Sequence, residues 1–269
     1  MINFKTEKLF SVISVFCAIV FLTACSNAIK ENSNSEKKDS LVINDKQLEK
    51  SVGLFKETTL PFTVDTALLF RIEKCDSLGG FEIKTLAANC FKHDLIGGLE
   101  YDLKTFYQID SIKAAGKYKQ YCDSLDIGMT KISTARAINE IQLDPNTLIL
   151  VWGLRTSSYE ACPYSSTWSV YFTVIYKGNV AETFLLGEYI SAGDAPVAMQ
   201  RTVTGKLLAG RLYPTFAIDV TQINDQDMDL PEVVIHKEQY VFAIKDGAIK
   251  LVSEKKNPET KVARKTVGF

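Results

Sequence analysis

The sequence predicts a mainly β fold: an antiparallel meander of about eight strands over residues 135–252, preceded by a smaller irregular or β-rich part. Two observations lead to this prediction. Apolar and polar residues alternate with a period of two in successive segments, and turn-forming residues separate those segments at the spacing of a meander. The composition allows one domain with a sizeable core, because 46% of the 269 residues are hydrophobic and 23% are charged.

Four turn signals divide the meander into four hairpins. Each signal contains Gly, Pro, Asn or Asp, which tolerate the backbone angles of tight turns. The signals are Asp144-Pro145-Asn146, Lys177-Gly178-Asn179, Ala209-Gly210 and Asp246-Gly247. The strands predicted beside them are 135–143 and 147–154, 168–176 and 180–189, 197–208 and 211–220, and 239–245 and 248–252.

The strand at 168–176 has the longest alternation of aromatic and β-branched residues in the chain, so we expect it at the centre of the sheet. Trp168 shares a face with Phe172 and is predicted to point into the core. Tyr171 occupies the opposite face, which an antiparallel sheet often leaves to solvent.

Residues 60–130 show a weaker pattern than the meander. Short strands are predicted at 60–64 and 81–85, and a helical turn is predicted after Asp65. These segments are too short to define a second domain, so we assign them to the same globular domain as the meander.

Residues 106–113 and 117–122 fit either one helix or two strands of a hairpin. We favour the hairpin, because Gly116 between them would weaken a helix interior by about 1 kcal/mol relative to alanine. Tyr118 and Tyr121 also favour strands.

The amino terminus carries a targeting pattern. Lys5 and Lys8 precede a run of about 15 apolar positions that ends in Leu22-Thr23-Ala24-Cys25. This motif resembles the lipobox of bacterial lipoproteins. The resemblance implies cleavage before Cys25, acylation of its thiol and attachment to a membrane of the cell envelope. Ser26 after that cysteine implies the outer membrane.

These features divide the chain into four parts. Residues 1–24 are the predicted signal peptide, 25–55 the lipidated cysteine with a polar tether, and 56–253 a single mostly β domain. Residues 254–269 contain five basic and two acidic residues, and we favour a loose tail there over a closing strand. Beyond the lipobox, residues 60–252 resemble envelope lipoproteins without an assigned activity, and that resemblance supplies no functional residues.

Four cysteines remain after the signal peptide and the lipidated residue are set aside: Cys75, Cys90, Cys122 and Cys162. In an oxidising envelope they suit two disulfides, and three pairings are open. Four buried free thiols suit the sequence equally well, because buried cysteine is a common small apolar residue. Cys162-Pro163-Tyr164-Ser165 resembles a monothiol glutaredoxin site, but the strand-like run that follows it argues against that chemistry.

No cofactor or metal is predicted. Asp225, Asp227 and Asp229 form a weak calcium candidate, because they match only the first half of an EF-hand loop. Two histidines, His93 and His236, are too few for a zinc site of ordinary spacing. A net charge of −1 argues against a nucleic-acid partner.

Two functional hypotheses remain. The first is a non-catalytic envelope protein that binds a glycan or another protein through aromatic side chains, for which the candidates are Trp152, Tyr159, Tyr164, Trp168 and Tyr171. The second is a glycan or cell-wall hydrolase that uses a pair of carboxylates. We favour the first, because no Ser-His-Asp, Cys-His or phosphate-binding motif is complete.

Overall fold

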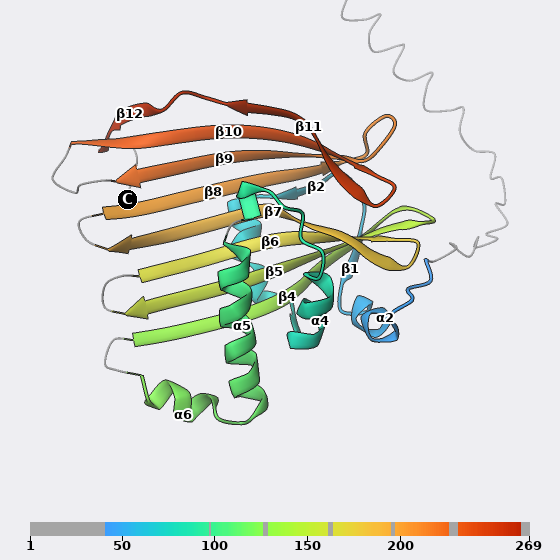
Figure 1. Ribbon diagram of the computed structural model, residues 1–269, viewed down its shortest axis with the longest axis horizontal. Coiled ribbons are helices and arrows are strands. Elements are labelled where there is room, and N and C mark those ends of the chain that lie inside the picture. The colour runs from blue at the N-terminus through green and yellow to red at the C-terminus, as the bar shows by residue number, and fades with distance from the viewer. Residues whose placement is uncertain are drawn as a thin grey trace, which may run out of the picture. The chain divides into compact units, whose positions relative to one another are not determined.

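The computed structural model describes residues 41–264, except 97, 126–128, 161–163, 195–196 and 226–230 (Figure 1). The described residues lie in one unit of the chain, Asp39–Phe269. Its main feature is a large, mostly antiparallel sheet of consecutive strands, with a smaller helical and irregular part at its amino-terminal end. The predicted fold class is therefore confirmed.

Long strands β4 to β11 follow one another in the sheet in chain order, and every neighbouring pair is antiparallel. Figure 1 shows them side by side. Their bounds are β4 (Met129–Asp144), β5 (Thr147–Glu160), β6 (Tyr164–Tyr176), β7 (Asn179–Asp194), β8 (Val197–Leu208), β9 (Thr215–Asp225), β10 (Glu232–Lys245) and β11 (Ala248–Lys256).

Short strands are added to the edges of this meander. Strands β1 (Lys56–Thr58) and β3 (Asp76–Leu78) pair with β4, the first in parallel and the second antiparallel. Strand β2 (Phe62–Val64) pairs with β8, and β12 (Thr260–Ala263) pairs with β10. The predicted loose tail at 254–269 is therefore wrong over its first ten residues, because β11 continues to Lys256 and β12 follows it.

The turn signals mark where the long strands meet. The pairs Asp144↔Thr147, Tyr176↔Asn179 and Lys245↔Ala248 close three hairpins at the predicted positions. Lys177 and Asp246 adopt positive φ there, beside Gly178 and Gly247. The strands are longer than predicted at their opposite ends, where polar residues continue the ladder.

The sheet divides between β7 and β8. These strands pair only between Glu188–Asp194 and Val197–Val203, while the rest of β8 pairs with β2. Past the division, aromatic rings of the two halves pack together. The ring centroids of Phe172 and Phe216 are 4.9 Å apart, and those of Phe184 and Phe242 are 4.7 Å apart.

Helices form much of the amino-terminal part. They are α2 (Lys46–Val52), α3 (Thr66–Leu69), α4 (Gly80–Leu86), α5 (Leu99–Ala114) and α6 (Tyr118–Asp123), with 3₁₀ turns η1 (Ile72–Lys74) and η2 (Asp94–Ile96). The helical turn after Asp65 is confirmed, and the Asp65 carboxylate accepts a hydrogen bond from the Leu68 backbone N–H at 2.8 Å. Leu48 of α2 is buried, so the folded unit begins before residue 56.

Two predicted β segments are helical instead. Residues 81–85 lie in α4, and residues 106–114 and 118–122 lie in α5 and α6 rather than in a hairpin. Leu99, Phe106 and Ile109 bury one stripe of α5 at helical spacing. Gly116, which we placed in a hairpin turn, has a φ of 68° just after α5 and marks the end of that helix.

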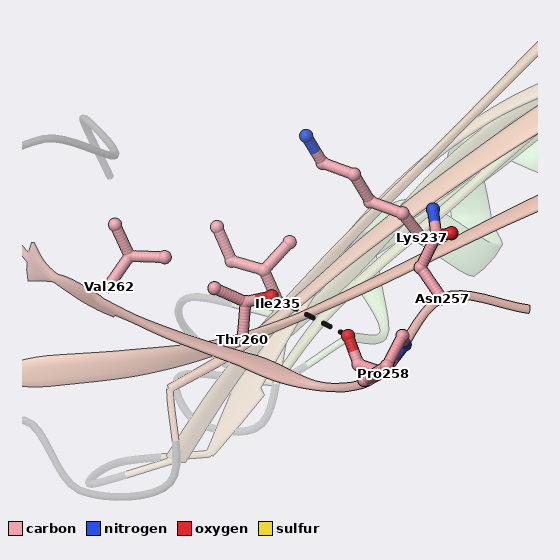
Figure 2. Close-up of a pocket in the computed structure, with 6 residues that line it drawn as sticks. All are labelled: Ile235, Lys237, Asn257, Pro258, Thr260 and Val262. Carbon is pink, nitrogen blue, oxygen red and sulfur yellow. Dashed lines mark hydrogen bonds between the residues drawn. The ribbon is translucent and has the colours of Figure 1, made fainter.

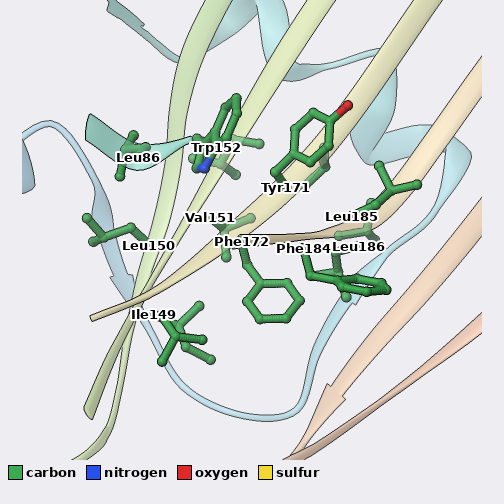
Figure 3. Close-up of a cluster of buried hydrophobic side chains, with 14 of the residues drawn as sticks. Leu86, Ile149, Leu150, Val151, Trp152, Tyr171, Phe172, Phe184, Leu185 and Leu186 are labelled. Carbon is green, nitrogen blue, oxygen red and sulfur yellow. The ribbon is translucent and has the colours of Figure 1, made fainter. Parts of the chain in front are cut away.

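Both faces of β5 and β6 are covered. On one face, the Thr173 hydroxyl donates to the Leu86 carbonyl of α4 at 3.0 Å, and Trp152 stacks on Tyr171 with ring centroids 4.7 Å apart (Figure 3). On the other face, Ile72 of η1 packs over Gly153. The expectation that Tyr171 occupies an open face is wrong, because the helical layer leaves it only 1% exposed.

None of the helices in the described ranges is long and apolar enough to cross a membrane.

Candidate functional site

A polar cleft lies on one face of β8, β9 and β10, and its volume is about 350 Å³. Ten residues line it: Asp94, Leu95, Arg201, Val220, Gln222, Asn224, His236, Glu238, Tyr240 and Lys256. We call this group the polar cleft. Most of its side chains carry hydrogen-bonding groups, whereas the sheet beside it is closed by aromatic packing.

Strand register assembles the floor of the polar cleft. Arg201 of β8 pairs with Gln222 of β9, and Gln222 pairs with His236 of β10. Directly cross-strand residues share a face, so these three side chains form a row. In a neighbouring row, Glu238 is paired with Lys256 of β11. Backbone hydrogen bonds between four neighbouring strands therefore fix the positions of the residues on the cleft floor.

One wall of the polar cleft is the turn η2. The His93 ring accepts a hydrogen bond from the Leu95 backbone N–H at 3.2 Å and packs edge-on against Tyr240, with centroids 5.3 Å apart. Arg201 donates to the Leu95 carbonyl at 3.3 Å. These contacts fix Asp94 and Leu95 over the strands.

Arg201 joins the polar cleft to the interior. Its Nη1 lies 2.9 Å from Oε2 of Glu188, a residue of β7 that is only 3% exposed. The Ser169 hydroxyl donates to Oε1 of the same carboxylate at 3.3 Å. Burial raises the pKa of Glu188, and the positive charge of Arg201 and the Ser169 hydrogen bond oppose that rise.

A second buried carboxyl, Asp102, lies near Glu188. It projects from the first turn of α5 and is 5% exposed. Burial, together with the negative charge of Glu188, raises the pKa of Asp102 to about 7, although a hydrogen bond from Thr156 opposes the rise. Neither carboxyl lines the polar cleft; Arg201 connects them to it.

The polar cleft offers both donors and acceptors. The Gln222 amide donates to the Asn224 side-chain oxygen at 3.0 Å, and the Tyr240 hydroxyl donates to Oε2 of Glu238 at 2.6 Å. Burial and the hydrogen bond to Glu238 raise the pKa of Tyr240, so its hydroxyl stays protonated. Such a surface suits a ligand with several hydroxyl or amide groups.

The predicted binding aromatics do not form one platform. Trp152 and Tyr171 are buried in the core, and the Trp152 indole N–H donates to the Thr173 hydroxyl at 2.9 Å. Their assignment as binding side chains is corrected, because the layer of α4 and α5 covers them. Tyr159 and Tyr164 are 44% and 38% exposed and lie opposite each other at the end of β5 and β6.

Trp168 occupies an intermediate position. It lies on the predicted face with Phe172, but it is only partly buried at the edge of the core. Phe70 packs edge-on against it at 5.3 Å, and the Arg155 guanidinium lies 5.2 Å from its ring centroid. Trp168 therefore belongs to the α3 side of the sheet and not to the polar cleft.

Three of the predicted disulfide cysteines, Cys75, Cys90 and Cys122, are free thiols. The fourth, Cys162, lies outside the described residues, as does the lipidation candidate Cys25. No disulfide therefore joins Cys75, Cys90 and Cys122 to one another. Burial raises the pKa of Cys90, which makes it a poor nucleophile.

The calcium candidate is only partly described. Asp225 is buried, and its carboxylate lies 2.8 Å from the Arg264 guanidinium. The guanidinium therefore balances the negative charge that a calcium ion would otherwise balance. Asp227 and Asp229 lie outside the described residues. Within the described ranges, no group of three or more His, Cys, Asp or Glu side chains is placed to hold a metal ion.

A second hollow, of about 470 Å³, lies between β10 and β12 (Figure 2). Its lining residues are Ile235, Lys237, Asn257, Pro258, Thr260 and Val262. It has fewer polar side chains than the polar cleft, and the Thr260 hydroxyl donates to the Pro258 carbonyl at 3.5 Å. The polar cleft is therefore the stronger candidate site.

Sequence reasoning did not find the polar cleft. A signal was present: Gln222 and Asn224, and likewise His236 and Glu238, place polar residues at inward positions where the same strands elsewhere carry aromatic residues. The set spans η2 and four strands, so only the register reveals that these residues meet.

The fold and the polar cleft define a class of protein: a β-meander domain with a hydrogen-bonding cleft on one face of its sheet. No protein family, curated protein or solved structure matches the chain.

Proposed function

We propose that this protein is a lipid-anchored, non-catalytic component of the bacterial cell envelope whose polar cleft binds a glycan. The observation that supports binding is the row of Arg201, Gln222 and His236 on rigid strands, with a carboxylate and an ammonium beside it. The Leu22-Thr23-Ala24-Cys25 motif supports the anchor and the envelope location.

The mixed chemistry of the polar cleft supports a glycan rather than a strongly charged ligand. Among the lining residues, Arg201 and Lys256 are balanced by Asp94 and Glu238, so the cleft has no large charge of one sign. Amide, guanidinium and carboxylate groups together can donate to and accept from the adjacent hydroxyls of a sugar. Tyr240 is buried at the floor, and its hydroxyl holds the Glu238 carboxylate in place.

The arrangement of carboxyls supports binding over hydrolysis. A glycoside hydrolase needs two carboxyls with different environments on either side of the scissile bond. Asp102 and Glu188 have such environments, but both are buried and neither lines the polar cleft, so substrate would not reach them in this conformation. The carboxyls that do line the cleft are Asp94 and Glu238, and the Glu238 carboxylate is already engaged by the Tyr240 hydroxyl at 2.6 Å.

Calorimetric titration with soluble envelope oligosaccharides tests the proposal. Gln222→Ala removes a cleft donor, and we expect its affinity to fall by about fivefold, since one hydrogen bond is worth about 1 kcal/mol. Gln239→Ala is the matched control, because Gln239 is exposed on the opposite face and donates to Asp219. Equal affinity of the two variants, or no heat with any oligosaccharide, would contradict a glycan site in the cleft.

A further inference from the structure

The first turn of α5 is attached to the sheet through a buried polar cluster. Asp102 faces β5, where Thr156 hydrogen-bonds to it, and it lies close enough to Glu188 of β7 for the two charges to interact. Glu188 is held by Ser169 of β6 and Arg201 of β8. This cluster crosses four strands underneath one helix turn.

The titratable groups around Asp102 come from several elements. Glu188 and Arg201 are the charged members on the sheet. Tyr171 of β6 is fully buried, and burial raises its pKa, so it remains a neutral phenol. Cys90, which interacts with Tyr171, is also neutral because burial raises its pKa. On α5 itself, Glu100 is exposed.

Arg201 extends the cluster to the polar cleft. The same guanidinium contacts the buried Glu188 carboxylate and the Leu95 carbonyl of η2, and it lines the cleft floor. Turn η2 is one wall of the cleft and lies just before α5 in the chain. A change in the protonation of Asp102 or Glu188 can therefore affect η2, the cleft wall, through the Arg201 side chain.

We propose that Asp102 and Glu188 form a proton-dependent latch that regulates the polar cleft. A proton on Asp102 holds the first turn of α5 and the η2 wall against the sheet. When that proton passes to solvent, two carboxylates face each other in a buried site, and α5 and η2 loosen. The effect on glycan binding rests on the proposed function, whereas the latch itself does not.

The chemistry of the pair supports this latch. Like charges in a low-dielectric interior repel strongly, so one member of a buried carboxyl pair keeps its proton. Arg201 and Ser169 stabilise the ionised form of Glu188, which leaves Asp102 as the member that holds the proton. The latch is therefore closed in acidic solution and loosens as the pH rises to about 7.

Hydrogen exchange of the purified full chain tests the latch without any ligand. Protection in Leu99–Phe106, corrected for the intrinsic exchange rate, is expected to fall by about tenfold or more from about pH 5.5 to pH 8.5, since each unit of pKa shift is a tenfold change in an equilibrium. Asp102→Asn should keep protection within about twofold over that range. Glu100→Gln, which removes an exposed carboxyl from the same turn, should behave as wild type.

Glu188→Gln provides a second variant. It removes the opposing charge and frees Arg201, so the fall in protection with rising pH should be smaller than in the wild type. Protection in the wild type that does not change with pH, or an equal fall in Asp102→Asn, would overturn the latch. Because exchange is measured without ligand, that result leaves glycan binding standing, and a failed glycan titration leaves the latch standing.

Discussion

Asp102 makes the stability of the fold depend on pH. Its pKa is about 7 in the folded protein against 3.8 for a free side chain, so the folded state holds the proton more tightly. Stability from this group is therefore complete below about pH 4, declines as the pH rises to about 7 and is level above that. The lost stability weakens the packing of α5 against the sheet, because Asp102 lies on the buried face of that helix.

Asp102→Asn should therefore raise the free energy of unfolding above neutral pH by about 2 to 4 kcal/mol and change it little near pH 4. The amide stays neutral and can donate to Glu188, whereas the ionised carboxylate repels it. Urea unfolding at the two pH values measures the difference. An Asp102→Asn variant that is less stable than wild type at both would contradict the assigned cause.

Tyr171 and Trp168 exchange the roles that the sequence predicts for them. Tyr171→Ala should cost about 3 to 5 kcal/mol, because it removes a fully buried ring and leaves a cavity beside Trp152. Trp168→Ala should cost about 1 to 3 kcal/mol, since its ring is only partly buried. Thermal melts of both variants compare the two costs, and a smaller loss for Tyr171→Ala would refute the face assignment.

The alternation of β6 was readable from sequence, but the covering of its two faces was not. A period of two separates Trp168 from Tyr171 correctly. It does not say which side a helix will cover, and α4 and α5 were not recognised as helices. A strand face exposed to solvent and a strand face covered by a helix both show the same period-two spacing of residues in the sequence.

At the scale of elements, the turn between β10 and β11 fastens the two halves of the sheet. Gly247 has a φ of 81°, and a Cβ there would lie 2.7 Å from the Cβ of Tyr176. Nearby, the Ile249 backbone N–H donates to the Glu182 carboxylate of β7. This hairpin tip is therefore packed against the hairpin of β6 and β7.

Gly247→Ala should destabilise the protein by more than about 1 kcal/mol, because it adds a clash to the conformational strain. Gly116→Ala is the control: its φ is 68°, but nothing lies within 4 Å of the added Cβ. Chemical denaturation should show the larger loss for Gly247→Ala. Equal losses would mean that the hairpins are not packed as the structure shows.

Hairpins were predictable because their signals are local. Gly178 and Gly247 sit in turns with positive φ, a demand that few residues meet. Helix α5 was missed because its evidence is not local: Asp102 and Thr105 lie on its buried stripe, so the stripe is not purely apolar. Burial against the sheet, rather than sequence pattern alone, stabilises that helix.

On the scale of the whole molecule, the proposed anchor is a single residue. Cys25→Ala should abolish incorporation of radiolabelled palmitate, because the acyl chains are attached through that thiol. Ser26→Ala is a control that keeps the cysteine and should still be labelled. Labelling of the Cys25→Ala variant would show that the lipobox assignment is wrong.

The candidate site could not be predicted as a unit. Arg201, Gln222 and His236 are distant in sequence and meet only through two strand pairings. The sequence placed only Arg201 within a predicted strand, because the strands predicted at 211–220 and 239–245 exclude Gln222 and His236. Those residues form a cleft only because strand pairing brings them together and η2 packs over them.

The central claim is that the polar cleft holds a glycan in the envelope. The most direct measurement places a diazirine amino acid at position 222, or at position 239 on the opposite face, and irradiates living cells. The account predicts adducts of sugar mass at position 222 and none at position 239. Equal adducts at both positions, or none at position 222, would contradict it.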